Sequence, residues 1–158
     1  MLLAALSAGD GIPPQNSKKG EPPGVASFEE GARNLLEAFE KNDPAVASGF
    51  FFPAYAFDLV KDLPVPGRYH RKLVRWYEED IGTARKRFAR GTWELEKVEL
   101  GRCRWKEPGT EGNKVAYWSC RGNFATARQG DRTRRFEIRV LINWGDRWYV
   151  THLGPIRH

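Results

Sequence analysis

Cysteine and histidine, the usual ligands of transition metals, are scarce in this sequence. Its 158 residues include two cysteines and three histidines. Cys103 and Cys120 do not form a Cys-x-x-Cys pair, which argues against a zinc site and against thioredoxin-like redox chemistry. His70, His152 and the terminal His158 show no metal-ligand spacing. The sequence therefore predicts neither a metal nor a cofactor.

Two further signatures are missing. The apolar runs are too short for a membrane-spanning helix, so none is predicted. The glycines of "GRCRWKEPGTEG" lack the strand–glycine–helix context of a phosphate-binding loop, and there is no Gly-x-Ser-x-Gly elbow. Nucleotide-binding loops and serine-hydrolase elbows are therefore not expected.

Positive charge and aromatic side chains are abundant. The net charge is +6, and 13% of the residues are aromatic, which is ample bulk for the core of one domain. Residues 68–90 carry eight bases and three acids. Such a run is either a solvated face or a surface for nucleic acid, an anionic membrane or an acidic partner. The predicted basic surface comprises Arg85, Lys86, Arg87, Arg90, Arg121, Arg135 and Arg139.

The N-terminal "LLAALSAG" resembles the end of a secretory signal, with the small residues Ala5 and Ser7 before a cleavage point. It lacks a charged n-region, so the alternative is a plain tail. We favour an exported or periplasmic protein over a cytoplasmic one. Residues 1–26 are predicted to be a disordered tail, because Gly, Pro, Ser and Lys dominate residues 9–26. Residues 27–158 form the single predicted domain.

Helices come first along the chain. Ser27 and Glu30 form a capping box, which predicts a helix over 28–41. Asp43 and Pro44 begin a short second helix that Pro53 breaks or bends. A long helix is predicted over about 67–89 from its apolar stripe.

After Gly91 the apolar period changes to two. Four antiparallel strands are predicted, over 92–105, 114–127, 133–143 and 147–153. Helices followed by an antiparallel meander indicate an α+β fold. In the last strand, the alternation places Trp148, Val150 and His152 on one face.

The strand pairing can be predicted from the apolar pattern. The first hairpin brings Cys103 opposite Cys120, with Trp105 opposite Trp118; an exported protein would have a disulfide there and a cytosolic one two thiols. In the next hairpin, paired residue numbers sum to 260, which opposes Trp118, Cys120, Gly122 and Phe124 to Ile142, Val140, Ile138 and Phe136 on the core face. The wet face would then carry Arg121, Asn123, Arg135, Glu137 and Arg139.

The ending Gly145-Asp146-Arg147-Trp148-Tyr149-Val150, together with this element order, resembles the nuclear transport factor 2/ketosteroid isomerase superfamily, also called SnoaL-like. The resemblance covers about residues 27–153. It implies N-terminal helices packed on a strongly curved four-stranded sheet that encloses a cone-shaped cavity. "VKDLPVPG" is too short for the hairpin that many members insert between the second and third helices, and a cystatin-like sheet is the neighbouring alternative.

Enzymes of that superfamily transfer protons with a few polar side chains inside the cone. By this resemblance His152 is a candidate base with Asp58 or Asp80 as its carboxylate, against the alternative of a structural histidine. Tyr117 or Trp118 points inward, depending on the register. The other predicted pocket residues are Tyr55, Trp76, Tyr77, Trp148 and Val150, with core packing as their alternative role.

Three functions are consistent with these features. We favour a non-enzymatic accessory domain that binds a small apolar ligand or a partner protein. The second is a small-molecule isomerase or hydratase that uses His152, and the third is nucleic-acid binding through the basic helix and sheet face. A homodimer through the sheet is compatible with the fold, although the arginines there argue against a large apolar interface.

Overall fold

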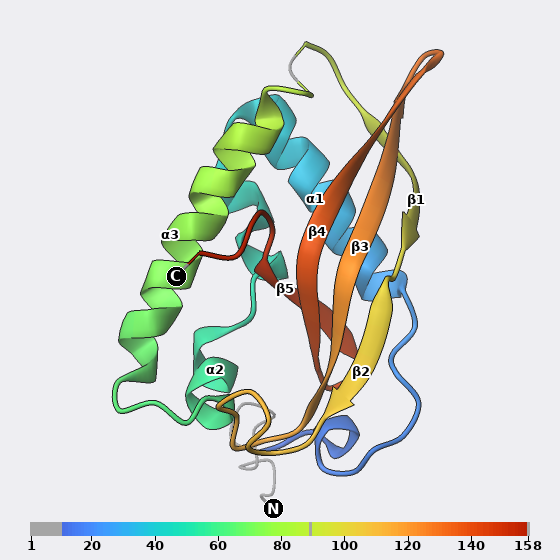
Figure 1. Ribbon diagram of the computed structural model, residues 1–158. Helices are drawn as coiled ribbons and strands as arrows, with labels where there is room; N and C mark the ends of the chain where they lie inside the picture. Colours follow the sequence, from blue (N-terminus) through green and yellow to red (C-terminus); the bar gives the residue numbers. More distant parts are fainter. Residues whose placement is uncertain (1–10, 89, 158) are drawn as a thin grey trace, which may run out of the picture.

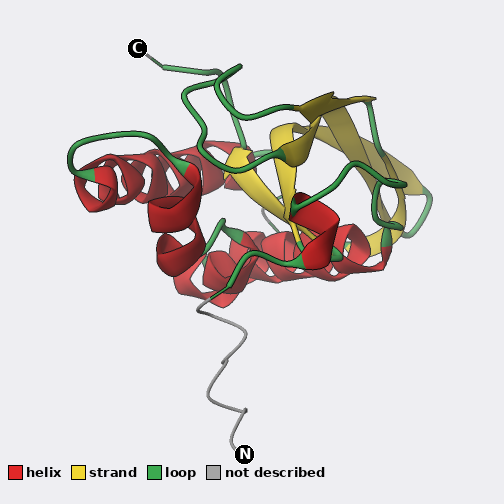
Figure 2. Ribbon diagram, turned by 90° about the horizontal axis from the view of Figure 1, so that it is seen from below, coloured by secondary structure: helices red, strands yellow, loops and turns green. Residues whose placement is uncertain are grey.

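The α-helices in the described part of this protein gather on one side of an antiparallel sheet (Figures 1 and 2). The computed structural model describes residues 11–88 and 90–157. The α-helices are α1 (Ala26–Lys41), α2 (Ala54–Val60) and α3 (Pro66–Arg85), and the 3₁₀ helices are η2 (Pro14–Asn16) and η3 (Pro44–Phe50). The strands are β1 (Glu94–Glu99), β2 (Arg102–Lys106), β3 (Tyr117–Gln129), β4 (Arg132–Trp144) and β5 (Arg147–His152). None of the described helices is long and apolar enough to cross a membrane.

This architecture confirms the predicted α+β class. The sheet has five strands instead of the predicted four, and it is not strongly curled, so the cone shape stays a prediction. The strand order is β1-β3-β4-β5, with β2 also paired to β3. The strands β1 and β2 thus follow each other along one edge of β3.

The predicted strand 92–105 is divided at Gly101. The Gly101 amide donates a hydrogen bond of 2.9 Å to Asn123 Oδ1. A Cβ atom at Gly101 would collide with the backbone of Arg121 and Gly122. Only glycine therefore allows the two backbones to approach this closely at residue 101. Gly122 has a φ of +72°, in the left-handed region. The close approach of the two backbones therefore separates β1 from β2.

The pairing of β3 with β4 differs by one residue from the prediction. Paired numbers sum to 261, so that Ser119 lies opposite Ile142 and Ala125 lies opposite Phe136. Trp118, Cys120 and Phe124 are therefore on the outer face, and the predicted core register is wrong. A shift of one residue exchanges the two faces of a strand.

Asn123 explains why the apolar match was misleading. Its side chain is fully buried, and its Nδ2 donates to Cys120 O at 2.9 Å and to Ile138 O at 3.0 Å. Because these bonds satisfy the amide, a polar residue occupies the helix-facing side of β3. Arg121 lies on that same side, opposite Val140. Neither Arg121 nor Asn123 is on the solvent-exposed face of the sheet, where the sequence predicted both.

The outer face is covered in part by its own side chains. The guanidinium of Arg135 lies 3.9 Å from the centroid of the Phe124 ring. Trp105 packs against Trp118, with 5.7 Å between the ring centroids. Arginine and tryptophan side chains shield apolar surface in this way without a second layer of structure.

The first hairpin has the register that the sequence predicted. Cys103 lies opposite Cys120, and Trp105 lies opposite Trp118. The structure joins the two cysteines by a disulfide. This bond fastens β2 to the first part of β3.

A β-bulge changes the face on which His152 lies. Leu141 pairs with Val150, whereas Val140 pairs with His152, so Thr151 is an extra residue in β5. Trp148 and Val150 therefore share the face of Leu141, and His152 lies on the opposite, helix-facing side. The predicted common face of these three residues is wrong because simple alternation takes no account of the bulge.

The two residues of the predicted capping box bind β5 instead of capping α1. Ser27 Oγ accepts a hydrogen bond from Trp148 N at 2.8 Å, and Glu30 pairs with Arg147 at 2.9 Å. The helix begins two residues earlier than predicted, at Ala26, without a side-chain cap. The predicted cap at Asp43 is confirmed, because its carboxylate accepts from Ala45 N at 3.1 Å.

The segment before α1 is held against the sheet. Asn16 is buried, donates to Ala116 O at 3.0 Å and accepts from Gly145 N at 2.7 Å. Asn16 belongs to residues 1–26, which the sequence predicted to be a disordered tail. In the structure these hydrogen bonds hold it next to the β4–β5 turn. Residues 1–10, with the signal-like stretch, lie outside the described residues.

Two helical glycines have opposite surroundings. A Cβ atom on Gly31 of α1 would overlap the Phe50 ring of η3, whereas one on Gly82 of α3 would meet nothing within 4 Å. We expect Gly31→Ala to destabilise the fold by about 1–3 kcal/mol through overpacking. Gly82→Ala should stabilise it by roughly 0.5–1 kcal/mol through helix propensity. Guanidinium unfolding curves measure both, and a Gly31→Ala protein as stable as the parent would contradict this packing.

Candidate functional site

A cavity of about 260 Å³ lies between α2, α3 and the helix-facing side of the sheet. One part of its wall is apolar and the other part is polar. The apolar and aromatic lining residues are Phe57, Tyr69, Leu73, Val140 and Ile142. The polar lining residues are Lys61, Glu111, Tyr117, Arg121, Thr151 and His152.

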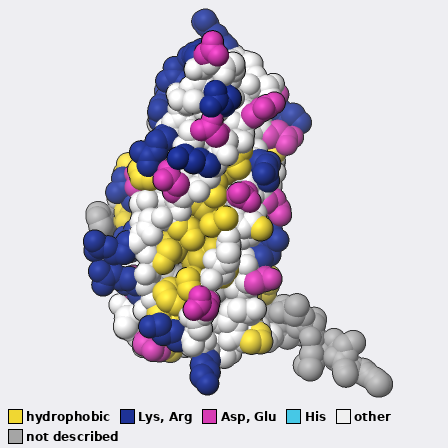
Figure 3. All heavy atoms as spheres, turned by 90° about the vertical axis from the view of Figure 1, so that its right-hand side faces the viewer, with side chains coloured by type: hydrophobic (Ala, Val, Ile, Leu, Met, Phe, Trp, Pro, Cys, Tyr) yellow, Lys and Arg dark blue, Asp and Glu magenta, His cyan; other side chains and the backbone are white. Residues whose placement is uncertain are grey.

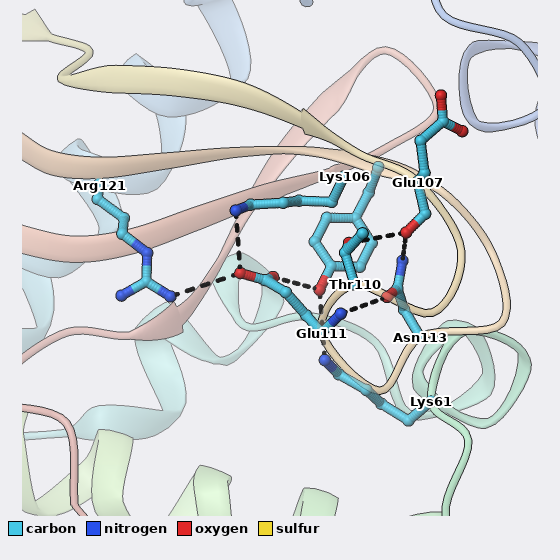
Figure 4. Close-up of polar contacts among 8 residues, drawn as sticks. Lys61, Lys106, Glu107, Thr110, Glu111, Asn113 and Arg121 are labelled. Carbon is cyan, nitrogen blue, oxygen red and sulfur yellow. Dashed lines mark hydrogen bonds and ion pairs between the residues drawn. The ribbon is translucent and has the colours of Figure 1, made fainter.

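Glu111 is the centre of the polar wall (Figure 4). Its Oε1 accepts a hydrogen bond of 2.7 Å from the Tyr117 hydroxyl. Its Oε2 lies 3.3 Å from Lys106 Nζ and 3.7 Å from an Arg121 nitrogen. Lys61 Nζ donates to the same Tyr117 hydroxyl at 3.4 Å. Side chains from β2 and β3 therefore converge on a carboxylate of the β2–β3 loop, and Lys61 from the end of α2 joins them through the Tyr117 hydroxyl.

The β2–β3 loop holds Glu111 in place. Asn113 Oδ1 accepts from Glu111 N at 2.9 Å, while Asn113 Nδ2 donates to Glu107 O at 3.2 Å. Lys114 N donates to Val60 O at 2.6 Å, which ties the loop to the last residue of α2. The buried Asn113 thus fixes the loop that presents the carboxylate.

The polar wall contains more basic than acidic side chains. Burial alone would raise the pKa of Glu111, but the hydrogen bond from Tyr117 and the charges of Lys106 and Arg121 lower it below its ordinary value. Glu111 is therefore an anion at neutral pH. Burial lowers the pKa of Lys61, and the charge of Glu111 opposes that effect. Lys106 and Arg121 pair with this one carboxylate, and Lys61 lies next to it on the Tyr117 hydroxyl, which leaves an excess of positive charge beside the cavity.

His152 faces this positive charge. Its Nδ1 lies 3.1 Å from Thr151 Oγ1, and no carboxylate of the described chain hydrogen-bonds to it. Burial, followed by the charges of Arg121 and Lys61, lowers its pKa from 6.5 to about 4. The imidazole is thus neutral at pH 7, and it can either donate or accept a hydrogen bond.

The carboxylates predicted for His152 lie elsewhere. Asp58 is exposed on α2 and does not line the cavity. Asp80 on α3 accepts from Gly154 N at 3.1 Å and pairs with Arg157 at 2.7 Å. The structure therefore does not bring either carboxylate to His152.

Most of the predicted pocket residues lie outside this cavity. Tyr55 is exposed, and the Tyr77 hydroxyl donates to Ala47 O at 2.8 Å within the core. Trp148 Nε1 donates to Pro23 O at 3.2 Å on the other side of the sheet. Of the two alternatives set by register, Tyr117 lines the cavity and Trp118 does not. The predicted pocket residues absent from the lining are Tyr55, Trp76, Tyr77, Trp118, Trp148 and Val150.

The predicted basic surface is divided among three places. Arg85, Lys86, Arg87 and Arg90 lie at or just beyond the C-terminal end of α3, and Arg121 lines the cavity. On the outer face Arg135 pairs with Glu99 at 3.8 Å, and Arg139 pairs with Glu137 at 3.4 Å. These residues do not form one continuous patch.

Sequence reasoning missed Lys61 and Glu111. Both lie in connecting segments, where no periodicity marks a side chain as inward-facing, and they meet only because the β2–β3 loop packs on the end of α2. Arg121 was recognised as basic but placed on the opposite face. The sequence signal that was available for these residues was an excess of basic over acidic side chains around an apolar strand. Such an excess does not show which side chains contact one another.

Within residues 11–88 and 90–157, no group of three His, Cys, Asp or Glu side chains is placed to hold a metal ion. Comparison with known proteins found no matching family model, curated protein or solved structure. The chemistry of the cavity therefore has to be argued from its own geometry.

The charge of Arg121 should be measurable at His152. We expect the His152 ring to titrate near pH 4 in proton NMR, since burial and the Arg121 and Lys61 charges disfavour the imidazolium. Arg121→Gln should move that midpoint upward towards 6.5, whereas Arg139→Gln, on the outer face, should leave it in place. An unchanged midpoint in Arg121→Gln would refute the coupling.

This titration also predicts how stability depends on pH. The unfolded histidine has the higher pKa, so as pH falls through 6.5 the unfolded state takes up a proton before the folded state does. His152 should therefore reduce stability progressively between pH 6.5 and about 4. In His152→Gln this loss should be smaller, as measured by urea unfolding at a series of pH values.

Proposed function

We propose that this chain is a nuclear-transport-factor-2-like binding domain whose cavity holds a small organic anion with an apolar body. The observation that carries this proposal is the excess of positive charge opposite an apolar wall. Helices preceding an antiparallel sheet, and the Gly145–Val150 ending, support membership of that superfamily. A cone-shaped sheet belongs to the same proposal.

Arg121 is the main anion-binding group in this proposal. Its side chain is 54% exposed, and its nearest carboxylate, Glu111, is 3.7 Å away. A guanidinium has five N–H donors in a planar fork, so it retains donors for a second carboxylate. Lys61 adds a second positive charge at the cavity wall. A ligand carboxylate would bind between them without displacing the Tyr117–Glu111 hydrogen bond.

The remaining wall suits a short apolar body. Phe57 and Leu73 from the helices face Val140 and Ile142 from β4 across the cavity. At about 260 Å³ the space lies just below the range of about 300–1,000 Å³ that is common for ligand sites, so the ligand is small. His152 supplies one neutral polar group for a hydroxyl or carbonyl of the ligand.

A proton-transfer enzyme is the second candidate, and it rests on His152. A neutral imidazole inside a cavity is the form required of a general base, and the nearby cations would stabilise an oxyanion. No carboxylate orients the ring, which is why we place binding first. Turnover that is lost in His152→Gln while ligand affinity is kept would favour the enzyme.

A panel of short-chain and aryl-substituted carboxylic acids, each matched with the alcohol of the same skeleton, tests the proposal. We expect the acids to bind more tightly than their alcohols. Arg121→Gln should weaken acid binding by about 10- to 100-fold, the value of a charge-assisted hydrogen bond, and leave alcohol binding unchanged. Arg139→Gln provides the matched control. Isothermal titration calorimetry measures the affinities.

Two results would contradict the proposal. One is a panel in which no acid binds. The other is equal affinity for each acid and its alcohol, because the cations would then contribute nothing. Assignment of chemical-shift changes to Leu73 and Ile142 would show whether a bound acid occupies this cavity.

A further inference from the structure

Strand β2 forms part of the outer edge of the sheet (Figure 1). One of its faces carries a row of cations. In the described structure it pairs with β3 alone. Arg102, Arg104 and Lys106 occupy alternate positions along it, so they point to the same face. An edge strand also presents unpaired backbone N–H and C=O groups.

Nearby carboxylates neutralise only part of the positive charge of this row. Arg102 and Arg104 are exposed, and no carboxylate of the described chain lies within 4.0 Å of either guanidinium. Lys106 Nζ lies 3.3 Å from Glu111 Oε2, and Arg121 pairs with the same carboxylate. Arg102 lies opposite Arg121, whose own nearest carboxylate, Glu111, is 3.7 Å away and is shared with Lys106. Like charges opposite each other destabilise a sheet unless an anion compensates them.

The other face of β2 is apolar. It carries Cys103 and Trp105, both half-buried, beside Cys120 and Trp118 of β3. The side of the molecule that bears β1 and β2 shows an apolar strip between charged side chains (Figure 3). Half-buried apolar residues along this edge include Leu95, Val98, Leu100 and Cys103. The disulfide fixes β2 in its register, so the edge is a rigid template.

We propose that β2 accepts an extended segment of a partner protein, with alternating acidic and apolar residues, as an additional antiparallel strand. The backbone of that segment would pair with the open edge of β2. Its acidic side chains would lie opposite Arg102, Arg104 and Lys106, and its apolar side chains would lie beside Cys103 and Trp105. This proposal is independent of the ligand in the cavity.

Two other occupants fit the edge less well. A second copy paired through β2 would place its own cations opposite this row, which is repulsive. A single-stranded nucleic acid would be attracted by the charge, but it would leave the edge backbone groups unpaired. The aromatic rings of this hairpin, Trp105 and Trp118, lie on the face opposite Arg102, Arg104 and Lys106, and Lys19 already lies 5.8 Å from the centroid of the Trp118 ring. Backbone pairing and the two-residue period favour a peptide.

The experiment titrates the full chain into a labelled synthetic peptide of alternating Glu and Val at low salt, with fluorescence anisotropy as readout. We expect binding that weakens as salt is added. A peptide with Lys in place of Glu should bind at least about tenfold more weakly, as should one N-methylated on the residues facing β2. Amide hydrogen exchange within residues 102–106 should slow when the Glu-Val peptide is bound.

Charge-reversal variants locate the site. Arg102→Glu/Arg104→Glu should weaken binding at least about tenfold, with Arg102→Gln/Arg104→Gln as a milder variant should the reversal disturb folding. Arg71→Glu/Arg75→Glu, on exposed positions of α3, has the same charge change and should retain affinity.

Absence of Glu-Val binding, equal affinity for the Lys peptide, or no effect of N-methylation would overturn the proposal. So would single-stranded DNA that binds more tightly without protecting the amides of residues 102–106.

Discussion

The buried amide of Asn123 fixes much of this fold. Its Nδ2 donates to Cys120 O and Ile138 O, and its Oδ1 accepts from Gly101 N. Only one register of β3 against β4 satisfies the amide in this way, and a buried amide left unsatisfied costs about 1–3 kcal/mol. The same residue therefore sets which face of β3 packs on the helices and where β1 separates from β2. It also places Arg121 on the cavity side.

Much of the fold could be predicted from local patterns. Periodicity gave the helices, and the change to a period of two gave an antiparallel sheet. The pairing of Cys103 with Cys120 followed from alternation on both sides of a short loop. The next hairpin was misjudged because its core face was assumed to be the more apolar one. In fact the helix-facing side of β3 carries Ser119, Asn123 and Ala125, and bulk from distant elements fills the space: Phe39 of α1 lies 5.5 Å from Phe136 between ring centroids.

The cavity was harder to predict than the fold. His152 was expected at a pocket and does line one, but with none of its expected partners. The extra residue Thr151 turns His152 away from Trp148, and no local signal marks that bulge. Lys61, Glu111 and Arg121 come from an α2 terminus, a loop and a strand, so their meeting depends on tertiary packing. Arg121 was predicted on the solvent-exposed face of the sheet. It lines the cavity because the observed register of β3 against β4 differs from the predicted one by a single residue.

The contacts of the N-terminal segment also set an order on biosynthesis. Asn16 is satisfied by Ala116, Asn143 and Gly145, and Ser27 accepts from Trp148. Residues from the beginning of the described chain thus find their partners in and around its last two strands. Since domains fold as units during synthesis, α1 can pack on η3 early, but its contacts with β5 form only after β5 has emerged. Completion of this domain therefore requires β5, its last strand, and the N-terminal segment lacks its sheet contacts until that strand is in place.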